Sequence, residues 1–443
     1  MNTDMFKAYD IRGKVGTELT PEACTAIARA FADWLPAEGA VAVGYDMRPD
    51  SAELAEAFMN GLQQQGREVM DIGRVTSDMI YFAIGAFDLA GGAVITASHN
   101  PGAYNGIKLY RDKVTPVGLE SGLDMVRDAA QANSFNNAAT RGERTKRTIT
   151  DDWVEHCLQF SPRLKPYKIA IDAGNGMAGA ILPHILPKLP LEVEEMYFEL
   201  DGTFPNHEAN PQKPENMRDL MQKVQDQQLD FGIAFDGDGD RAGFVDDKGR
   251  MVLGSDLMSI MAKYYLEKYP NASVVHEVRT SHATLELIRQ WGGTPVRTKA
   301  GRTYIGAKLR EVGAPFGGET TGHFFFKENY DADSGLITAL VAMQALSDSG
   351  KKLSELVDEY HMYAMGPEVN FEVADTQAVF QRLKAEFADG RQDELDGLTV
   401  EYPTMWFNIR ASNTEPLMRL NAEAHSQREL DELVTRITKI IEQ

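Results

Sequence analysis

The pattern of hydrophobic and polar positions contains one unit three times: an apolar strand, a polar loop and an amphipathic helix. The unit occupies residues 40–66, 167–186 and 273–293. In the first copy, Asp50 or Ser51 is expected to cap a helix that stops at Gly66. The second copy has a glycine-rich turn over 174–176. Because strands alternate with helices, the pattern predicts three α/β domains in series with parallel sheets.

Weakly patterned stretches between these units predict the domain boundaries. A polar segment near residue 145 indicates a linker, residues 246–256 predict a hairpin turn followed by a new helix, and Gly366 marks a last boundary. Helical patterns over 377–387 and 427–441 flank a strand-like segment at 404–416, which predicts an α+β fold for the tail. The expected domains are therefore 1–148, 149–252, 253–364 and 365–443.

Composition and charge limit the classes of partner that this protein is expected to bind. The 443 residues carry a net charge of −21, from 45 basic and 66 acidic residues. This balance argues against nucleic acid and anionic membranes as partners, and any anionic small substrate needs locally concentrated positive charge. No run of about 18 apolar residues and no basic-then-apolar leader is found, and two cysteines are too few for a disulfide framework. A cytoplasmic location is expected.

The sharpest chemical signal is "FGIAFDGDGDRAGFV", where a buried strand runs into Asp236, Asp238 and Asp240. Three carboxylates brought together by intervening glycines need a cation, and oxygen-only ligands favour magnesium. The dinucleotide-binding pattern G-x-G-x-x-A is formally present, but these aspartates would repel a pyrophosphate. An EF-hand is excluded because its sixth and twelfth positions are Arg241 and Asp247. A solvated acidic turn is the alternative interpretation.

Ser98 lies in "AVITASHNP", just past the end of an apolar run. Strand ends of open α/β sheets bind ligands, although a serine that only bonds the turn backbone would fit equally well. Adjacent residues of an extended chain point to opposite sides, so Ser98 and His99 are expected to diverge. This expectation and the lack of a G-x-S-x-G elbow argue against a serine hydrolase.

Two further loops carry polar groups. In "GETTGHFFF", Glu319 and Thr321 would face one side of an extended loop and could hold vicinal sugar hydroxyls, while 324–326 is expected to be core strand. His323 could donate a hydrogen bond or act as acid or base, or be structural. "RASNTEP", residues 410–416, offers donors that suit a phosphate, or else a capped turn. Together with the serine and the acid cluster, these loops predict a phosphosugar enzyme in which Ser98 carries a phosphoryl group.

The set "AYDIRG", "TASHNP", "DGDGDR", "GETTGH" and "RASNTEP", in this order, resembles the α-D-phosphohexomutase superfamily and its bacterial phosphomannomutase/phosphoglucomutase group. The resemblance implies four domains around a central cleft, Mg²⁺ held by the three aspartates and phosphorylated Ser98, and a hexose 1,6-bisphosphate intermediate. Glu319 and Thr321 would read sugar O3 and O4. The reacting end would be lined by Arg12, His99, Lys108, Arg241 and His323. The other phosphate would be held by Arg410, Ser412, Asn413 and Thr414, with further substrate contacts from Tyr9, Arg279, Lys299, Arg302 and Arg419.

The chain departs from the group's pattern at three positions. Many members have Lys-x-Gly-His where this chain has Lys299 to Arg302, and an arginine cannot act as a neutral base. Thr321 replaces the usual serine, and Arg279 stands where some members have lysine. These changes leave the preferred hexose phosphate open. A phosphoglucosamine mutase, a metal-dependent sugar phosphatase and a non-catalytic phosphosugar sensor are the alternatives, and a monomer or weak homodimer is expected.

Overall fold

The computed structural model describes residues 1–136, 138–411 and 417–442, which form two compact units. The first unit comprises Met1–Leu253 and Thr321–Ser354, and the second comprises Gly254–Thr320 and Glu355–Gln443. Within the described ranges, no helix is long and apolar enough to cross a bilayer. Cys24 and Cys157 are both buried as free thiols.

The N-terminal part of the first unit is built on a mixed sheet with the order β1-β5-β4-β2-β3-β7 and with β6 beside β5. β4, β2, β3 and β7 run parallel to one another, whereas β5 is antiparallel to both β4 and β1. The strands are β1 (Ile11–Lys14), β2 (Val41–Tyr45), β3 (Val69–Arg74), β4 (Gly91–Ile95), β5 (Tyr104–Arg111), β6 (Thr115–Pro116) and β7 (Arg144–Lys146). The helices are α1 (Pro21–Trp34), α2 (Ser51–Gln64), α3 (Ser77–Ala86) and α4 (Leu123–Ala132).

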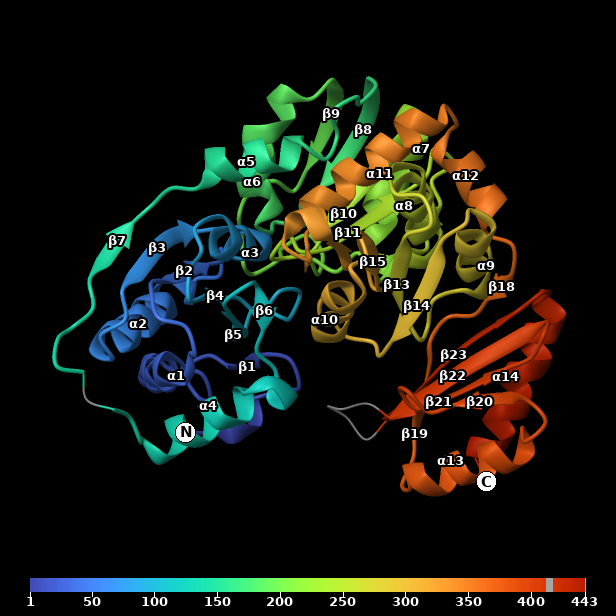
Figure 1. Cartoon of the computed structure of the whole chain (residues 1–443). Coiled ribbons are helices and arrows are strands. Elements are labelled where there is room, and N and C mark those ends of the chain that lie inside the picture. The colour runs from blue at the N-terminus through green and yellow to red at the C-terminus, as the bar shows by residue number, and fades with distance from the viewer. Residues whose placement is uncertain (137, 412–416, 443) are drawn as a thin grey trace. The chain divides into compact units, whose positions relative to one another are not determined.

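Helices cover both faces of this sheet (Figure 1). Ala93 and Ile95 of β4 join the core formed with α1, α2 and α4. A Cβ at Gly92, the residue before Ala93, would instead meet Ile80 and Ile84 of α3. Because successive strand residues point to opposite faces, α3 lies on the other side of the sheet. β4 is therefore buried on both faces, and its carboxyl end is a rigid platform for the loop that follows.

The remainder of the first unit contains a second mixed sheet of order β12-β11-β10-β8-β9. β8, β9 and β10 are parallel, and β11 and β12 return antiparallel. Leu220 and Val224 of α7 pack on this sheet. The elements are α5 (Thr150–Leu158), β8 (Tyr167–Asp172), α6 (Ala178–Ile185), β9 (Leu191–Met196), α7 (Arg218–Gln227), β10 (Phe231–Phe235), β11 (Ala242–Val245), β12 (Met251–Val252), β16 (Phe324–Phe326), β17 (Ala332–Asp333) and α11 (Gly335–Ser349).

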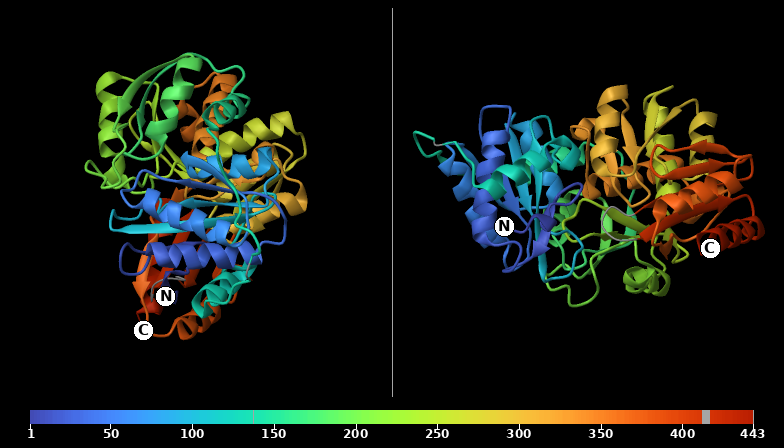
Figure 2. Two further views of the ribbon diagram at one scale, coloured as in Figure 1. Left: turned by 90° about the vertical axis from the view of Figure 1, so that its left-hand side faces the viewer. Right: turned by 90° about the horizontal axis from the view of Figure 1, so that it is seen from below.

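The second unit begins with the parallel strands β14-β13-β15. An antiparallel sheet follows, in which β23 pairs with β18, β19 and β22, and β21 joins β22 to β20. Figure 2 shows α14 beside these C-terminal strands. The elements are α8 (Gly254–Lys268), β13 (Ser273–Glu277), α9 (His282–Gln290), β14 (Thr294–Thr298), α10 (Arg302–Val312), β15 (Phe316–Gly318), α12 (Leu353–Tyr360, which spans the division between the units), β18 (Ala364–Met365), β19 (Val369–Glu372), α13 (Thr376–Glu386), β20 (Arg391–Asp393), β21 (Leu398–Glu401), β22 (Met405–Ala411), β23 (Leu417–Ala424) and α14 (Gln427–Ile441).

The α/β class, the hairpin and helix near 255, the buried strand at 324–326 and the α+β tail are all confirmed. Three local expectations are wrong. The first two sheets are mixed, because a hairpin returns the chain antiparallel after β4 and after β10. Neither Asp50 nor Ser51 caps α2 with its side chain, since the Ser51 hydroxyl donates to Asp46 instead. The segment near residue 145 forms the edge strand β7 rather than a plain linker.

Candidate active site

Ser98 lies three residues beyond the end of β4 and adopts a left-handed backbone conformation, with φ of 52°. Its hydroxyl donates a hydrogen bond of 2.9 Å to Oδ2 of Asp236. A Cβ at position 237 would come within 2.4 Å of the Ser98 carbonyl oxygen, so only glycine fits there. This close approach of the two loops brings the serine to the acid cluster.

The acid cluster follows β10 and is fully enclosed. Asp236, Asp238 and Asp240 are buried, and each offers an oxygen within 4.8 Å of the others. The Lys108 ammonium lies 2.5 Å from Asp238 and 2.6 Å from Asp240. The Ser77 hydroxyl also donates to Asp238. The Lys108 ammonium therefore partly offsets the charge of Asp238 and Asp240, and the Ser77 hydroxyl adds a hydrogen bond to Asp238.

The donor set fits a hard divalent cation. All three candidate ligands are carboxylates, and Oδ1 of Asp238 is buried without a hydrogen-bond partner in the described part of the chain. Burial raises the pKa of Asp236 to about 7; the adjacent Arg241 opposes this rise, and the charges of Asp240 and Asp238 add to it. Burial and Asp240 also act to raise the pKa of Asp238, but the Lys108 ammonium outweighs them and the pKa is lowered. Oxygen ligands of this kind suit Mg²⁺.

His99 and Arg241 complete the surroundings of the serine. The Arg241 guanidinium donates to Asp236 Oδ2 at 2.9 Å and to His99 Nδ1 at 2.5 Å. Nδ1 of His99 also lies 3.2 Å from the Ser98 hydroxyl, so the expectation that these two side chains diverge is wrong. The left-handed conformation of Ser98 is the reason, because it breaks the alternation of an extended chain. Burial lowers the pKa of His99 to about 2, helped by Arg241 and Arg12, which leaves the imidazole neutral.

Arg12 of β1 and His323, the residue before β16, belong to the same unit and approach this centre from other parts of the chain. Arg12 donates to the Asn100 side chain at 2.5 Å and pairs with Asp10 at 3.0 Å. His323 Nδ1 lies 2.6 Å from Asp333 and 3.9 Å from Asp240. In the first unit, hydrogen bonds and ion pairs thus link the serine and the three aspartates to four of the five side chains predicted to line the reacting end. These four are His99, Lys108, Arg241 and His323. Arg12 joins them through the serine loop.

In the second unit, Arg279 is held by a buried carboxylate. Glu277 lies 3.0 Å from Arg279 Nε and also accepts hydrogen bonds from the Arg279 main chain and the Thr320 hydroxyl. Burial acts to lower the pKa of Arg279, but the charge of Glu277 outweighs it and raises the pKa. Glu319 lies 3.9 Å from the same guanidinium. Arg279 is thus a fixed positive charge beside the predicted sugar-reading carboxylate.

A second group of cations surrounds Glu368. Its carboxylate lies 4.0 Å from Arg279, 3.9 Å from Arg410 and 3.9 Å from Arg419. Ser412, Asn413 and Thr414 lie outside the described residues. Arg410 of "RASNTEP" and Arg419 of β23 therefore share one carboxylate with Arg279.

The remaining predicted residues are placed as follows. Residues 320–321 form a turn, so the argument that an extended loop aligns Glu319 and Thr321 does not hold. Arg302 is the first residue of α10 and is largely buried, while Lys299 lies 5.4 Å from the Tyr304 ring. Tyr9 is half-buried in the bend before β1.

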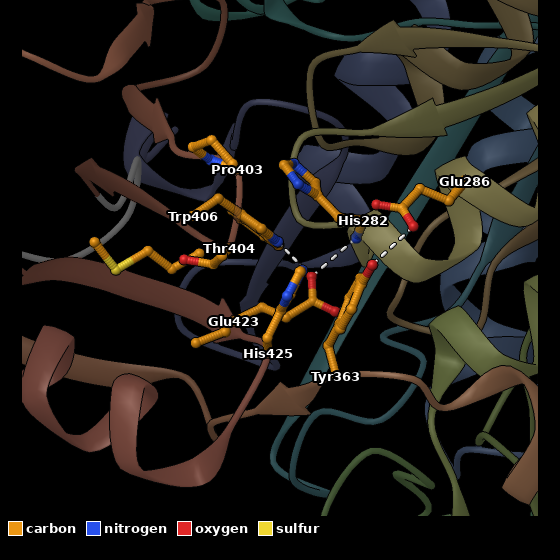
Figure 3. A pocket seen from close by; sticks show the side chains of 10 residues that line it. His282, Glu286, Tyr363, Pro403, Thr404, Trp406, Glu423 and His425 are labelled. Atoms are coloured by element: carbon orange, nitrogen blue, oxygen red, sulfur yellow. Dashed lines mark hydrogen bonds between the residues drawn. The ribbon is translucent and has the colours of Figure 1, made fainter.

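A small pocket in the second unit lies where His282 at the start of α9 meets Glu423 of β23 (Figure 3). Glu423 of β23 accepts a 2.9 Å hydrogen bond from the main chain of His282, the first residue of α9, and further bonds from Ser281 and Trp406. A carboxylate at a helix N-terminus is favourable. Because Ser281 follows Arg279 by two residues, this contact fixes the Arg279 loop to the strand that carries Arg419.

Comparison with known proteins decides the family. Four family models match consecutive parts of the chain: phosphoglucomutase/phosphomannomutase alpha/beta/alpha domains I, II and III over residues 3–156, 151–249 and 253–363, and the C-terminal domain over 368–440. The chain belongs to the phosphoglucomutase/phosphomannomutase family. It is therefore an enzyme of the phosphohexomutase type, as its motifs predict.

Full-length relatives agree with this family. The chain is 39% identical over 441 residues to a Xanthomonas campestris protein named "Phosphohexose mutases", with 98% of both chains covered. It is 35% identical to the phosphomannomutase/phosphoglucomutase of Pseudomonas aeruginosa, covering 97% of this chain and 94% of that one. A crystal structure of a family protein from Burkholderia thailandensis superposes with a TM-score of 0.92 at 31% identity, covering 99% and 97% of the two chains.

Several residues that build this family member's site carry no signal that the sequence analysis used. Ser77 and Asp333 contact the centre only because α3 and β17 fold against it. Glu277 lies two residues before Arg279, and an acid so near a predicted substrate-binding arginine could have been noticed. Glu368 follows the Gly-Pro boundary and Arg48 precedes Pro49, positions that suggest only turns.

Proposed function

We propose that this chain interconverts mannose 1-phosphate and mannose 6-phosphate, and also the corresponding glucose phosphates, through a phosphorylated Ser98 and a hexose 1,6-bisphosphate. One observation carries the proposal: the Ser98 hydroxyl bonds to Asp236 inside a buried cluster of three carboxylates. Binding of a sugar does not need a hydroxyl in such a place, whereas phosphoryl transfer does. The names of the full-length relatives support mannose and glucose phosphates as substrates.

The side chains around Ser98 suit phosphoryl transfer. Magnesium held by Asp236, Asp238 and Asp240 would offset their charge and stabilise negative charge on the phosphoryl group. Lys108 and Arg241 supply cationic donors on the same side. In the forward step the bond from phosphorus to Ser98 Oγ breaks as a bond to the free sugar hydroxyl oxygen forms, and the proton of that hydroxyl ends on Ser98 Oγ, which is released as a neutral hydroxyl. The reverse step returns the other phosphate of the bisphosphate to Ser98.

Other residues are proposed to bind the rest of the substrate. Glu319 and Thr321 are proposed to read the O3 and O4 hydroxyls, which mannose and glucose present alike. Arg410 and the residues that follow it would hold the phosphate that is not reacting. Arg279 and Arg419 share Glu368 with Arg410, which supports their part in this role. Further contacts are proposed from Tyr9, Lys299 and Arg302.

The test is a side-by-side assay of mannose, glucose and glucosamine 1-phosphates with Mg²⁺ and catalytic hexose 1,6-bisphosphate. We expect 6-phosphate products from mannose and glucose, with much slower turnover of the glucosamine compound. Equal or faster turnover of glucosamine phosphate would assign a phosphoglucosamine mutase instead. Release of inorganic phosphate without any 6-phosphate product would identify a phosphatase and end the mutase proposal.

A further inference from the structure

Arg48 bonds the loop that carries Ser98 at four points. It lies in the turn between β2 and α2, is only 3% exposed, and its guanidinium donates to four main-chain carbonyl oxygens. Nη2 reaches the oxygens of Ser98 at 2.9 Å and Asn100 at 2.5 Å. Nη1 reaches those of Pro101 at 3.1 Å and Tyr104 at 2.8 Å. One side chain therefore fixes both ends of the segment 98–104.

Arg48 is itself held in place from three sides. Asp46 lies 3.4 Å from Nε, with both side chains fully buried. The Phe204 ring centroid lies 5.2 Å from the guanidinium. A Cβ at Gly202 would come within 2.7 Å of the Arg48 Cα, so the backbone also has no room to shift. A group immobilised in this way can impose a conformation on the loop that it bonds.

The Ser98 backbone needs such support. A positive φ is unfavourable for a residue with a side chain, and it persists only where the surroundings enforce it. The Ser98 carbonyl is bonded by Arg48, and its oxygen is also where Gly237 approaches most closely. Since the direction of the carbonyl and that of the side chain are linked through the same backbone angles, holding the carbonyl also aims the hydroxyl.

We propose that Arg48 is a positioning residue for phosphoryl transfer: it holds Ser98 in the left-handed conformation that directs Oγ toward Asp236. The proposal rests on the function proposed above. Arg48 acts through the main chain of the loop and not on the reacting atoms. Its planar fork provides donors in a fixed arrangement, whereas a lysine ammonium has three donors on a flexible stem and cannot serve four carbonyls.

The experiment compares Arg48→Lys, Arg48→Met and the double variant Asp46→Asn/Arg48→Met with a matched control. The double variant removes the buried Asp46 charge that Arg48→Met would leave without its partner. The control is Arg67→Met, because Arg67 also clamps carbonyls, those of Ala32, Leu35 and Ala37 after α1. Hydrogen exchange and steady-state kinetics are measured on each folded protein.

We expect the backbone amide hydrogens of Ser98, Asn100 and Tyr104 to exchange at least about tenfold faster in the Arg48 variants than in wild type. We also expect kcat to fall about 10²-fold, with KM changed by less than about threefold, since substrate phosphate is bound elsewhere. The exchange rates and kcat of Arg48→Lys should lie between those of wild type and those of Arg48→Met. Arg67→Met should keep wild-type kcat and wild-type exchange in this loop.

Unchanged exchange in the loop, or unchanged kcat in the double variant, would overturn the proposal. A fall in kcat of the same size in Arg67→Met would also overturn it, because the effect would then be general destabilisation. Exchange is independent of turnover, so the two proposals fail separately. A wild-type protein without mutase activity contradicts the proposed function, while faster exchange in the Arg48 variants would still support the clamp.

Discussion

The Ser98 hydroxyl and the Asp236 carboxylate are 138 residues apart in the chain and 2.9 Å apart in the fold. Each lies just beyond the carboxyl end of a buried strand, β4 and β10 respectively. Strand ends of this kind leave side chains accessible above a rigid sheet. The contact joins two different sheets of the first unit, so the centre depends on how those sheets pack and not on one motif alone.

Removing the Ser98 hydroxyl should abolish turnover while leaving the fold intact. We expect Ser98→Ala to reduce kcat by at least about 10³-fold, because the group that carries the phosphoryl is lost. Ser161→Ala is the matched control, since Ser161 is also buried and its hydroxyl has no hydrogen-bond partner among the described residues. Near-normal rates in Ser98→Ala, with unchanged thermal unfolding, would refute the role of this serine.

Magnesium should stabilise the folded protein through the aspartates. For a ligand that binds only the native state, about 2.7 kcal/mol is gained at a concentration 100 times Kd. Asp236→Asn keeps an oxygen acceptor for Ser98 but removes one charge from three buried carboxylates. We expect this variant to lose most of the stabilisation by Mg²⁺, measured for each protein as the difference between its Tm in Mg²⁺ and its Tm in EDTA. An equal magnesium-dependent rise in Tm in both proteins would place the metal elsewhere.

Glu277 should be necessary for stability because it neutralises buried Arg279. Breaking a buried ion pair by removing one partner typically costs about 3–5 kcal/mol. We expect Glu277→Gln to lower the free energy of unfolding in urea by roughly this amount, and Glu277→Gln/Arg279→Met to recover part of it. A single variant as stable as wild type would show that Glu319 and Glu368 suffice to balance Arg279.

The stability of the C-terminal domain should depend on acid pH through Glu401. The nearby His282, whose Nε2 lies 3.7 Å from the carboxylate, lowers the pKa of Glu401 to about 2; burial opposes this shift and Arg297 reinforces it. A depressed carboxyl pKa adds stability above the unfolded value of about 4.3, and this stability is lost as pH falls toward 2. Glu401→Gln should therefore lower the free energy of unfolding at pH 7. The difference in this free energy between the variant and wild type should shrink as pH falls from 4.5 to the acid limit of folding.

The control for this pH series is Glu394→Gln. Glu394 pairs with Lys384 at 2.6 Å but is largely exposed, and exposed pairs contribute little. We expect its unfolding midpoint in urea to match wild type at every pH. A Glu401→Gln deficit that stays constant with pH would mean that the side chain stabilises by packing and not by its charge.

The sequence predicts the elements of this fold better than their pairing. Helices over 377–387 and 427–441 match α13 and α14 almost residue by residue, because their apolar spacing is local. The direction of β5 depends on a hairpin that the hydrophobic pattern does not encode. β7 is polar, and backbone pairing with β3 and ion pairs from Arg144 to Asp71 and Glu56 hold it at the sheet edge. Strand pairing is a property of the assembled sheet.

Prediction of the site from the sequence has the same limit, because contacts between distant segments leave no local pattern. The aspartates and Ser98 could be found because short motifs carry them. Arg48 could not, since bonds from a side chain to carbonyls fifty residues away leave no pattern in the sequence. The positive φ of Ser98 was equally hidden, because glycine or asparagine usually signals that conformation.

Peptide mapping of phosphate on the protein tests the central claim most directly. The purified enzyme is incubated with Mg²⁺ and glucose 1,6-bisphosphate, digested and examined by mass spectrometry beside Ser98→Ala. We predict one added phosphoryl group on the peptide that contains Ser98, and none in the variant. A fully active enzyme that carries no phosphate on Ser98, or carries it on another residue, would contradict the proposed mechanism.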